Sequence, residues 1–198
     1  YMRMPDVVGV IEMENLATLQ ALATRISNDA VAASQPDPQY AAYLIEGNDV
    51  GGIDVGFLVK TATVGANPRV EVLSVTQELD GTLFTNPDSS TETLNDRPPL
   101  MLRAVIHAAN GGTFPVTVIV NHLRSMNDVD NDVAGSNGWA TLGERVRAKR
   151  QAQAIDLANL VQARQTADPA ERIILVGDFN AFSVNDSLGD LVATICGT

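Results

Sequence analysis

The spacing of apolar residues predicts a chain that alternates between strands and helices. Residues 7–11 and 173–176 are nearly continuous apolar runs of strand length, and such runs are typical of buried strands. Between residues 14 and 29, apolar residues recur every three or four positions, which predicts a helix that ends at Asn28-Asp29. The longest helical pattern covers residues 141–167.

Further strands are predicted at residues 43–45, 55–59, 70–79, 100–108 and 114–120. The last two are separated by Asn110-Gly111-Gly112, a strong hairpin signal. Residues 80–99 and 122–138 are polar and turn-forming, and a final helix is predicted at residues 186–195. At least six strands, no internal repeat and no linker predict one α+β domain over residues 1–198.

Charge and composition reduce the number of functional classes that fit the chain. The net charge is -11, with 24 acidic against 13 basic residues, which argues against a broad basic surface for nucleic acid. They do not argue against an enzyme that binds a phosphate group through a metal ion. The single cysteine excludes an internal disulfide and a cysteine-rich zinc site, and two histidines leave little room for a multi-histidine metal centre.

Nothing at the start of the sequence predicts targeting. No apolar run approaches the ~18 residues of a membrane span, and no basic-then-apolar signal sequence opens the chain. Tyr1-Met2-Arg3-Met4 leads directly into a strand pattern, so we expect the sequence to begin inside a longer protein.

Polar side chains follow three of the apolar strands at the points where the strands end. Glu12 follows the first, Asn121-His122 another, and Asp178 and Asn180 the run at 173–176. Carboxylates are suitable ligands for Mg²⁺, Mn²⁺ or Ca²⁺, imidazole can transfer protons near neutral pH, and amides can hold a phosphate oxygen or a water. If the three strands end at one edge, the sequence predicts a catalytic cleft there.

Each of these residues also has a simpler interpretation. Glu12 alone fits a charge near a helix N-terminus, His122 alone fits a structural histidine, and Asp178 alone fits a turn cap. Their joint occurrence at three comparable strand ends favours the cleft.

Several ordered motifs resemble those of the endonuclease/exonuclease/phosphatase superfamily, the DNase I-like proteins. The three most informative stretches are Pro5-Asp6-Val7-Val8-Gly9-Val10-Ile11-Glu12, Asn121-His122-Leu123-Arg124-Ser125 and Gly177-Asp178-Phe179-Asn180-Ala181. The second is similar to the form found in bacterial extracellular nucleases, which implies an extracellular or cell-surface location. The segments 52–59 and 97–100, Trp139 and the stretch 145–154 fit in order and spacing.

The resemblance implies a four-layer α/β/β/α sandwich and metal-dependent phosphodiester hydrolysis by activated water, most simply by a nuclease acting on DNA or RNA. The resemblance also implies the site residues. Glu12 is the expected ligand of Mg²⁺ or Mn²⁺, with Ca²⁺ as a further candidate, and His122 is the expected acid/base group. Asp178 and Asn180 are expected to position the phosphate, the metal or the water, Asp54 to orient His122, and Arg97 and Asn121 to contact the substrate.

Two alternatives to a nuclease stay open. One is a phosphatase or phosphodiesterase acting on nucleotides or lipid headgroups, and the other is a catalytically silent binding module with the same fold. The family's early Asn and its late Asp and His motifs are absent from these 198 residues, so we expect a domain without its first and last strands, truncated at both ends.

Two charged segments have weaker interpretations. Arg145, Arg147, Lys149 and Arg150 form either a solvated helix face or a local contact with substrate. The acidic run 128–132 resembles a calcium loop, but Val133 and Trp139 stand where an EF-hand requires glycine and glutamate, so it is either a looser site or a solvated loop.

Overall fold

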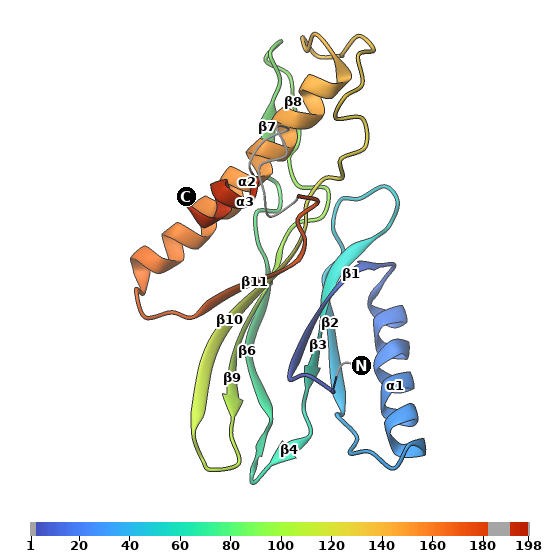
Figure 1. Cartoon of the computed structure of the whole chain (residues 1–198), viewed down its shortest axis with the longest axis vertical. Helices are drawn as coiled ribbons and strands as arrows, with labels where there is room; N and C mark the ends of the chain where they lie inside the picture. The colour runs from blue at the N-terminus through green and yellow to red at the C-terminus, as the bar shows by residue number, and fades with distance from the viewer. Residues whose placement is uncertain (1–2, 182–190, 198) are drawn as a thin grey trace. The chain divides into compact units, whose positions relative to one another are not determined.

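The computed structural model describes residues 3–181 and 191–197, and the chain divides into two compact units. Unit 1 comprises residues 1–78, 97–121 and 171–177, and unit 2 comprises residues 79–96, 122–170 and 178–198. Strands β10 (Thr113–His122) and β11 (Ile173–Asp178), both labelled in Figure 1, begin in unit 1, and the last residue of each belongs to unit 2.

Unit 1 contains a three-stranded sheet with the order β1-β3-β2. Its strands are β1 (Val7–Met13), β2 (Tyr40–Leu44) and β3 (Asp54–Lys60), and both neighbours pair antiparallel with β3. Helix α1 (Leu16–Ala32) begins after Asn15, whose side chain accepts a hydrogen bond from Thr18 N–H at 2.8 Å. The predicted helix was therefore right in its start, and it continues three residues beyond Asp29.

A second sheet has the order β11-β10-β9-β6. Strand β9 (Leu100–His107) pairs antiparallel with both β10 and β6 (Val70–Gln77), and the β9–β10 hairpin confirms the turn signal at Asn110. Two hydrogen bonds join β10 and β11 at the same offset, from Thr117 N–H to Arg172 O at 2.8 Å and from Leu123 N–H to Asp178 O at 3.0 Å. This constant offset means that β10 and β11 run parallel.

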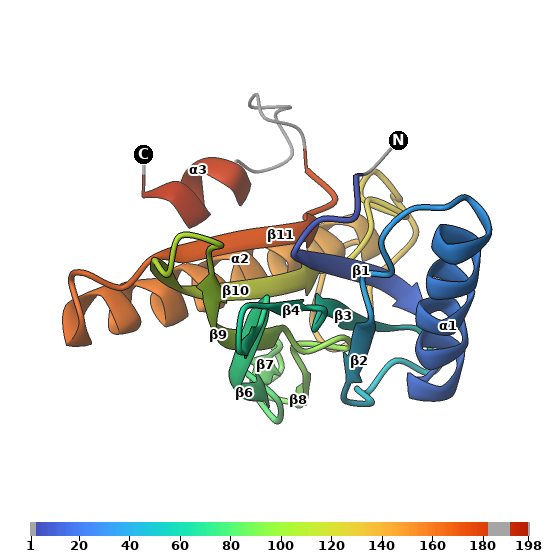
Figure 2. The ribbon, with the colours of Figure 1, turned by 90° about the horizontal axis from the view of Figure 1, so that it is seen from below.

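The two sheets of unit 1 pack face to face, and α1 covers the outer face of the three-stranded sheet (Figure 2). The core between the sheets includes Phe57 of β3, Leu102 of β9 and Val118 of β10. On the other side of β3, Leu58 packs with Leu19 and Ala23 of α1. The alternation of Phe57 and Leu58 between two cores explains why β3 is apolar at nearly every position.

The two apolar runs that the sequence assigns to buried strands are only half-buried. Strands β1 and β11 lie at the edges of their described sheets, and Ile174 is exposed. A continuous apolar run indicates burial on both faces, but it carries no information about which strand is the edge, so that part of the prediction was wrong.

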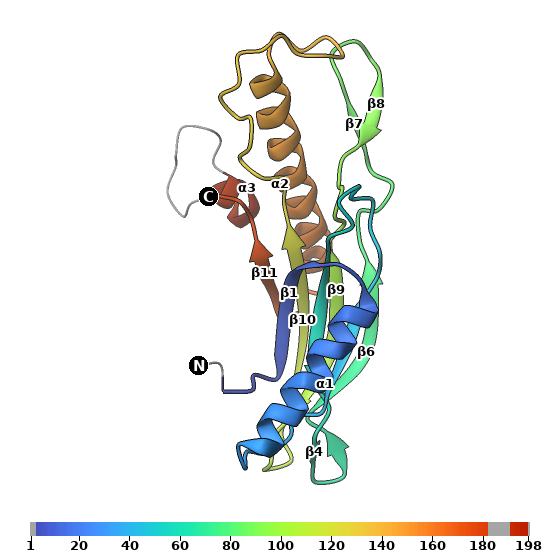
Figure 3. The ribbon, with the colours of Figure 1, turned by 90° about the vertical axis from the view of Figure 1, so that its right-hand side faces the viewer.

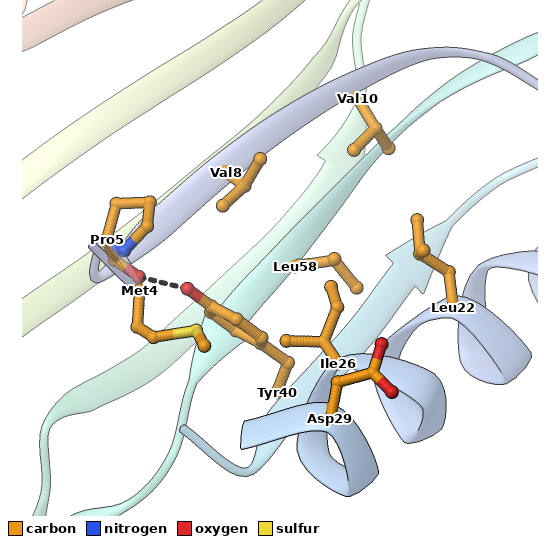
Figure 4. A pocket seen from close by; sticks show the side chains of 9 residues that line it. All are labelled: Met4, Pro5, Val8, Val10, Leu22, Ile26, Asp29, Tyr40 and Leu58. Carbon is orange, nitrogen blue, oxygen red and sulfur yellow. Dashed lines mark hydrogen bonds between the residues drawn. The ribbon is translucent and has the colours of Figure 1, made fainter. Parts of the chain in front are cut away.

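An apolar cavity of about 430 Å³ lies in unit 1 beside α1 (Figure 4). Its lining side chains include Val8, Leu22 and Leu58, with Asp29 and Tyr40 as the residues that carry polar side chains. The Tyr40 hydroxyl donates to Pro5 O at 2.6 Å, and burial, with a smaller contribution from Asp6, raises the pKa of this phenol. The cavity therefore lacks the convergent polar groups of a catalytic site.

Unit 2 is organised around helix α2 (Leu142–Ala167), which starts at the N-cap Thr141 as the sequence predicts. The polar segment before residue 97 contains a short hairpin, β7 (Leu83–Thr85) with β8 (Thr91–Thr93), which the turn-rich sequence did not indicate. Helix α3 (Leu191–Cys196) overlaps the predicted last helix and ends one residue beyond it, and the predicted start at Asp186 lies outside the described residues.

Unit 1 also contains a small two-stranded ribbon, in which β4 (Thr63–Val64) pairs antiparallel with β5 (Asn67–Pro68).

Candidate functional site

The sequence-predicted residues fall into two groups, one in each unit. Unit 1 holds Glu12, Asp54, Arg97 and Asn121, and unit 2 holds His122, Asp178 and Asn180. Within unit 1, strands β1, β10 and β11 run in the same direction, so their carboxyl ends lie at the same end of that unit (Figure 3). This arrangement is the one that the strand-end hypothesis requires of β1, β10 and β11.

Glu12 lies on a β-bulge. Val10 of β1 pairs with Gly56 and Met13 pairs with Asp54, so three steps along β1 oppose two along β3. Glu12 has a φ of 56°, in the left-handed region that is costly for residues with a side chain. Bulges of this kind redirect a side chain, and here the redirected side chain is an exposed carboxylate.

Asp54 begins β3 opposite Met13, the residue that follows Glu12. Its buried carboxylate accepts a hydrogen bond from Gly47 N–H at 2.8 Å. Burial raises the pKa of Asp54, the Gly47 hydrogen bond lowers it, and a side-chain hydrogen bond with Glu46 raises it further. The structure thus places Asp54 next to Glu12 in the sheet, and its role towards His122 stays a prediction.

Asn121 is fully buried at the end of β10. Its side-chain amide donates to Ile119 O at 3.1 Å and to Val176 O of β11 at 3.2 Å, which leaves Oδ1 without a hydrogen-bond donor among the described residues. Asn121 therefore ties β10 to β11 immediately before the two strands reach His122 and Asp178. Its predicted contact with substrate would have to use Oδ1.

Arg97 forms an ion pair with Asp49, with 3.1 Å between Nη1 and Oδ2, and both side chains are largely buried. The predicted contact between Arg97 and substrate stays a prediction.

In unit 2 a compact set of hydrogen bonds joins the loops that follow β10 and β11. Asn180 N–H donates to the carboxylate of Asp178 at 2.7 Å, and Asn180 Nδ2 donates to Leu123 O at 2.9 Å. Leu123 N–H in turn donates to Asp178 O. Because Leu123 directly follows His122, these bonds hold the predicted acid/base residue and the Asp178–Asn180 pair in one small region.

His122 is 6% exposed, and Asn180 has a φ of 48°. Asparagine is one of the residues that tolerates the left-handed region, and the Asp178 carboxylate forms the Asx turn that supports it. With Nδ2 of Asn180 donating to Leu123 O, Oδ1 is the acceptor atom that this side chain can offer to a water molecule or a cation.

Two residues of α2, Arg150 and Gln153, hold the same loops by hydrogen bonds that the sequence did not predict. Arg150 donates from Nη1 to Arg124 O at 2.5 Å and from Nη2 to Asn180 O at 2.6 Å. Gln153 accepts from Arg124 N–H at 2.9 Å through Oε1 and donates to Leu94 O at 2.9 Å through Nε2. Neither side chain is more than 4% exposed.

The solvated helix face proposed for the basic cluster is therefore wrong. Lys149 and Arg150 are 3% and 2% exposed, Lys149 pairs with Asp96, Arg145 pairs with Glu92, and Arg147 donates to Val129 O. The sequence does contain a signal for this. Residues 146, 150, 153 and 157 follow the spacing of one helix face, and Val146 and Leu157 are its apolar members.

The described residues contain no cluster of three or more histidine, cysteine, aspartate or glutamate side chains that could hold a metal ion. The Mg²⁺ or Mn²⁺ site that the motifs imply stays a prediction; Mg²⁺ typically binds one or two carboxylates and keeps several waters, so it needs few protein ligands. Glu12, an exposed carboxylate on the bulge, and the unpaired Oδ1 of Asn121 are oxygen donors of this kind. The acidic loop 128–132 contributes no such cluster.

Comparison with known proteins identifies the fold. No protein-family model matches the sequence, and no curated protein matches it. The structure aligns with the crystal structure of truncated Caenorhabditis elegans TDP2, with a TM-score of 0.50 and 17% identity over 94% of this chain and 52% of that chain. The chain has an α+β, DNase I-like fold.

The fold class predicted from the motifs is thereby confirmed, and the chain spans about half the length of the TDP2 structure. It also aligns with the structure of ANGEL2, described as a 2',3'-cyclic phosphatase, with a TM-score of 0.43 and 15% identity over 90% of this chain and 40% of that one. Among the described residues, no helix has both the length and the apolar composition to cross a bilayer.

Proposed function

We propose that this protein is a metal-dependent phosphodiester hydrolase that uses activated water, with a nucleic acid as the leading substrate class. The observation that carries the proposal is the hydrogen-bonded set of Leu123, Asp178 and Asn180, which gathers the chemistry of two strand ends beside His122. Carboxylate, imidazole and amide groups in one region are what proton transfer and water activation at a phosphate require.

The residues would divide the work as follows. Glu12 would hold a divalent ion, which when bound supplies positive charge at a non-bridging phosphate oxygen. His122 would exchange a proton with the reacting oxygen, while Asp178 and Asn180 Oδ1 would orient the water. Arg97 would contact the phosphate, Asn121 Oδ1 would accept a hydrogen bond from a donor group of the substrate, and Asp54 would support the His122 imidazole.

A second candidate, hydrolysis of small phosphodiesters or phosphomonoesters, is favoured by the positions of the basic residues. Arg145, Lys149 and Arg150 are buried or ion-paired within unit 2, and the chain carries a net charge of -11. Few of these cations are therefore available to neutralise a nucleic-acid backbone. A location outside the cell follows only from the motif resemblance and stays a prediction.

The test is hydrolysis of plasmid DNA, RNA, bis(p-nitrophenyl) phosphate and p-nitrophenyl phosphate, each with Mg²⁺, with Mn²⁺ and with EDTA. We expect activity that needs the metal and that falls about 100-fold or more in Glu12→Gln. Glu14→Gln is the matched control, because Glu14 is exposed two residues further along and should leave activity unchanged.

Full activity in EDTA, or an undiminished Glu12→Gln variant, would contradict the mechanism. The four substrates separate a nuclease from a phosphatase. A folded protein that hydrolyses none of them would instead support the catalytically silent binding module.

A further inference from the structure

Arg150 holds the backbone of both loops of unit 2 that carry the candidate chemistry. One of its terminal nitrogens contacts the loop after β10 at Arg124 O, and the other contacts the loop after β11 at Asn180 O. The two nitrogens belong to one rigid, planar guanidinium, so the separation of the two carbonyl oxygens is fixed by the geometry of a single group.

Arg150 contacts two residues of the candidate site region: Arg124, which is close in sequence to His122, and Asn180, which is itself a candidate site residue. Arg124 lies two residues after His122. Both of its backbone polar groups are hydrogen-bonded to side chains of α2: its O accepts from Arg150, and its N–H donates to Gln153. Asn180 combines a left-handed backbone with a side-chain bond to Leu123 O, so a shift of its carbonyl would also move its side chain.

We propose that Arg150 is the positioning residue of this site: its guanidinium sets the spacing between the His122 loop and the Asp178–Asn180 loop. This inference rests on the proposed function for its kinetic consequence, but the loop geometry can be measured without any activity. Arg150 touches neither substrate nor metal in this scheme. It acts through the two backbone carbonyls that it holds.

The substitution that tests the proposal is Arg150→Lys. Lysine keeps the charge and most of the volume, but its ammonium is a point donor that cannot span two carbonyls as a fork does. Arg145→Lys is the matched control. It is the same substitution on the same helix, and the hydrogen bonds of the Arg145 side chain go to Glu92 and not to either of the two loops.

The first measurement is steady-state kinetics on the best substrate of the hydrolysis panel. We expect Arg150→Lys to lower kcat by about 100-fold with KM changed less than threefold, because small misplacements of catalytic groups act on the chemical step. Added guanidinium should restore part of the kcat of Arg150→Ala, and added methylammonium should not. Arg145→Lys should keep wild-type kinetics.

The second measurement is hydrogen–deuterium exchange of peptides covering residues 121–126 and 178–181. We expect both segments to lose protection together in Arg150→Lys and to keep it in Arg145→Lys, with thermal midpoints of the two variants within a few degrees of each other. If the protein hydrolyses no phosphoester, the proposed function fails, and the exchange data still decide the positioning role.

Two results would overturn the proposal. One is an Arg150→Lys variant with wild-type kcat and wild-type exchange in both segments. The other is a loss of activity that follows global unfolding, with exchange raised equally across the chain. If Arg150→Ala does not fold, Arg150→Lys and Arg150→Gln carry the exchange comparison.

Discussion

The carbonyl oxygen of Asn121 occupies the place that a side chain at position 177 would need. A Cβ built on Gly177 would lie 1.9 Å from Asn121 O, far inside van der Waals contact, and Gly177 has a φ of 122°. Strand β11 can therefore lie this close to β10 only with glycine at this position. The residue after Gly177 is Asp178, so the close approach sets where the loop after β11, which carries Asp178 and Asn180, begins.

The first prediction concerns Gly177→Ala. We expect a loss of about 4 kcal/mol or more in the free energy of unfolding, because the added methyl group meets backbone atoms that cannot rotate away. Chemical denaturation followed by circular dichroism measures it. Gly65→Ala is the control, since Gly65 also has a positive φ of 64° but nothing lies within 4 Å of its built Cβ.

Gly65→Ala should cost only about 1 to 2 kcal/mol, the strain of a left-handed alanine. Equal losses in the two variants would mean that backbone strain alone explains Gly177 and that the contact with Asn121 relaxes.

The second prediction concerns the bulge at Glu12. Because Glu12 has a left-handed backbone, Glu12→Gly should leave the protein as stable or raise its stability by up to about 1 kcal/mol. The same variant should lose activity, since the carboxylate is gone. Thermal unfolding and the hydrolysis panel measure the two effects.

Glu12→Gln is the companion variant. It keeps the side-chain volume and the backbone strain, so it should lose activity without gaining stability. A Glu12→Gly variant that is clearly destabilised would show that the Glu12 side chain supports the fold, and the assignment of the residue to metal binding would lose its main structural argument.

More of the local structure than of the long-range pairing could be predicted from the sequence. Local patterns were sufficient for the hairpin at Asn110, the starts of α1 and α2, and the polar ends of β1, β10 and β11. These features depend on a few neighbouring residues, whose preferences act within one turn or one strand. The parallel pairing of β10 with β11 depends on residues more than 50 positions apart, and no periodicity reports it.

The role of Arg150 likewise could not be predicted from the sequence, because the pattern of charged residues does not show which of them are buried. Four basic residues within six positions have the composition of a solvated face, and composition does not show which of them turn inward. Arg150 is buried because two loop carbonyls need donors, and those carbonyls become known only once the loops are placed. A polar residue in line with Val146 and Leu157 is the sequence feature that could have indicated it.

The third prediction uses Trp139, the single tryptophan of the chain. Its indole donates to Asn86 Oδ1 at 2.8 Å and stacks on Phe84 with ring centroids 6.0 Å apart. Trp139→Phe keeps an aromatic ring but removes the donor, which leaves the oxygen of the buried Asn86 unsatisfied. We expect a loss of about 1 to 3 kcal/mol in the free energy of unfolding.

Circular dichroism rather than fluorescence must follow that unfolding, because the variant has no tryptophan. The control is a double-mutant cycle with Asn86→Ala. If the hydrogen bond carries the effect, Trp139→Phe should cost less in the Asn86→Ala background. Equal costs in both backgrounds would assign the loss to packing alone.

The fourth prediction concerns the pH dependence of stability at Asp54. Burial holds the pKa of Asp54 above its ordinary value in the folded state, so the folded protein binds this proton more tightly than the unfolded chain does. Stability from this group is therefore full at pH values below the unfolded pKa and declines as the pH rises through the folded pKa. Asp54→Asn should remove that decline, because asparagine keeps an acceptor for Gly47 N–H but does not ionise.

The measurement is the free energy of unfolding of wild type and Asp54→Asn across the acidic range up to neutral pH. The difference between the two proteins should move in favour of the variant as the pH rises. Asp156 is the matched comparison, since burial also raises the pKa of its carboxyl group, while Thr82 lowers it by a hydrogen bond. Asp156→Asn should show a separate effect of the same sign that adds to the first, since Asp54 and Asp156 lie in different units. A constant difference between wild type and Asp54→Asn would mean that Asp54 has the same pKa in the folded and unfolded chains.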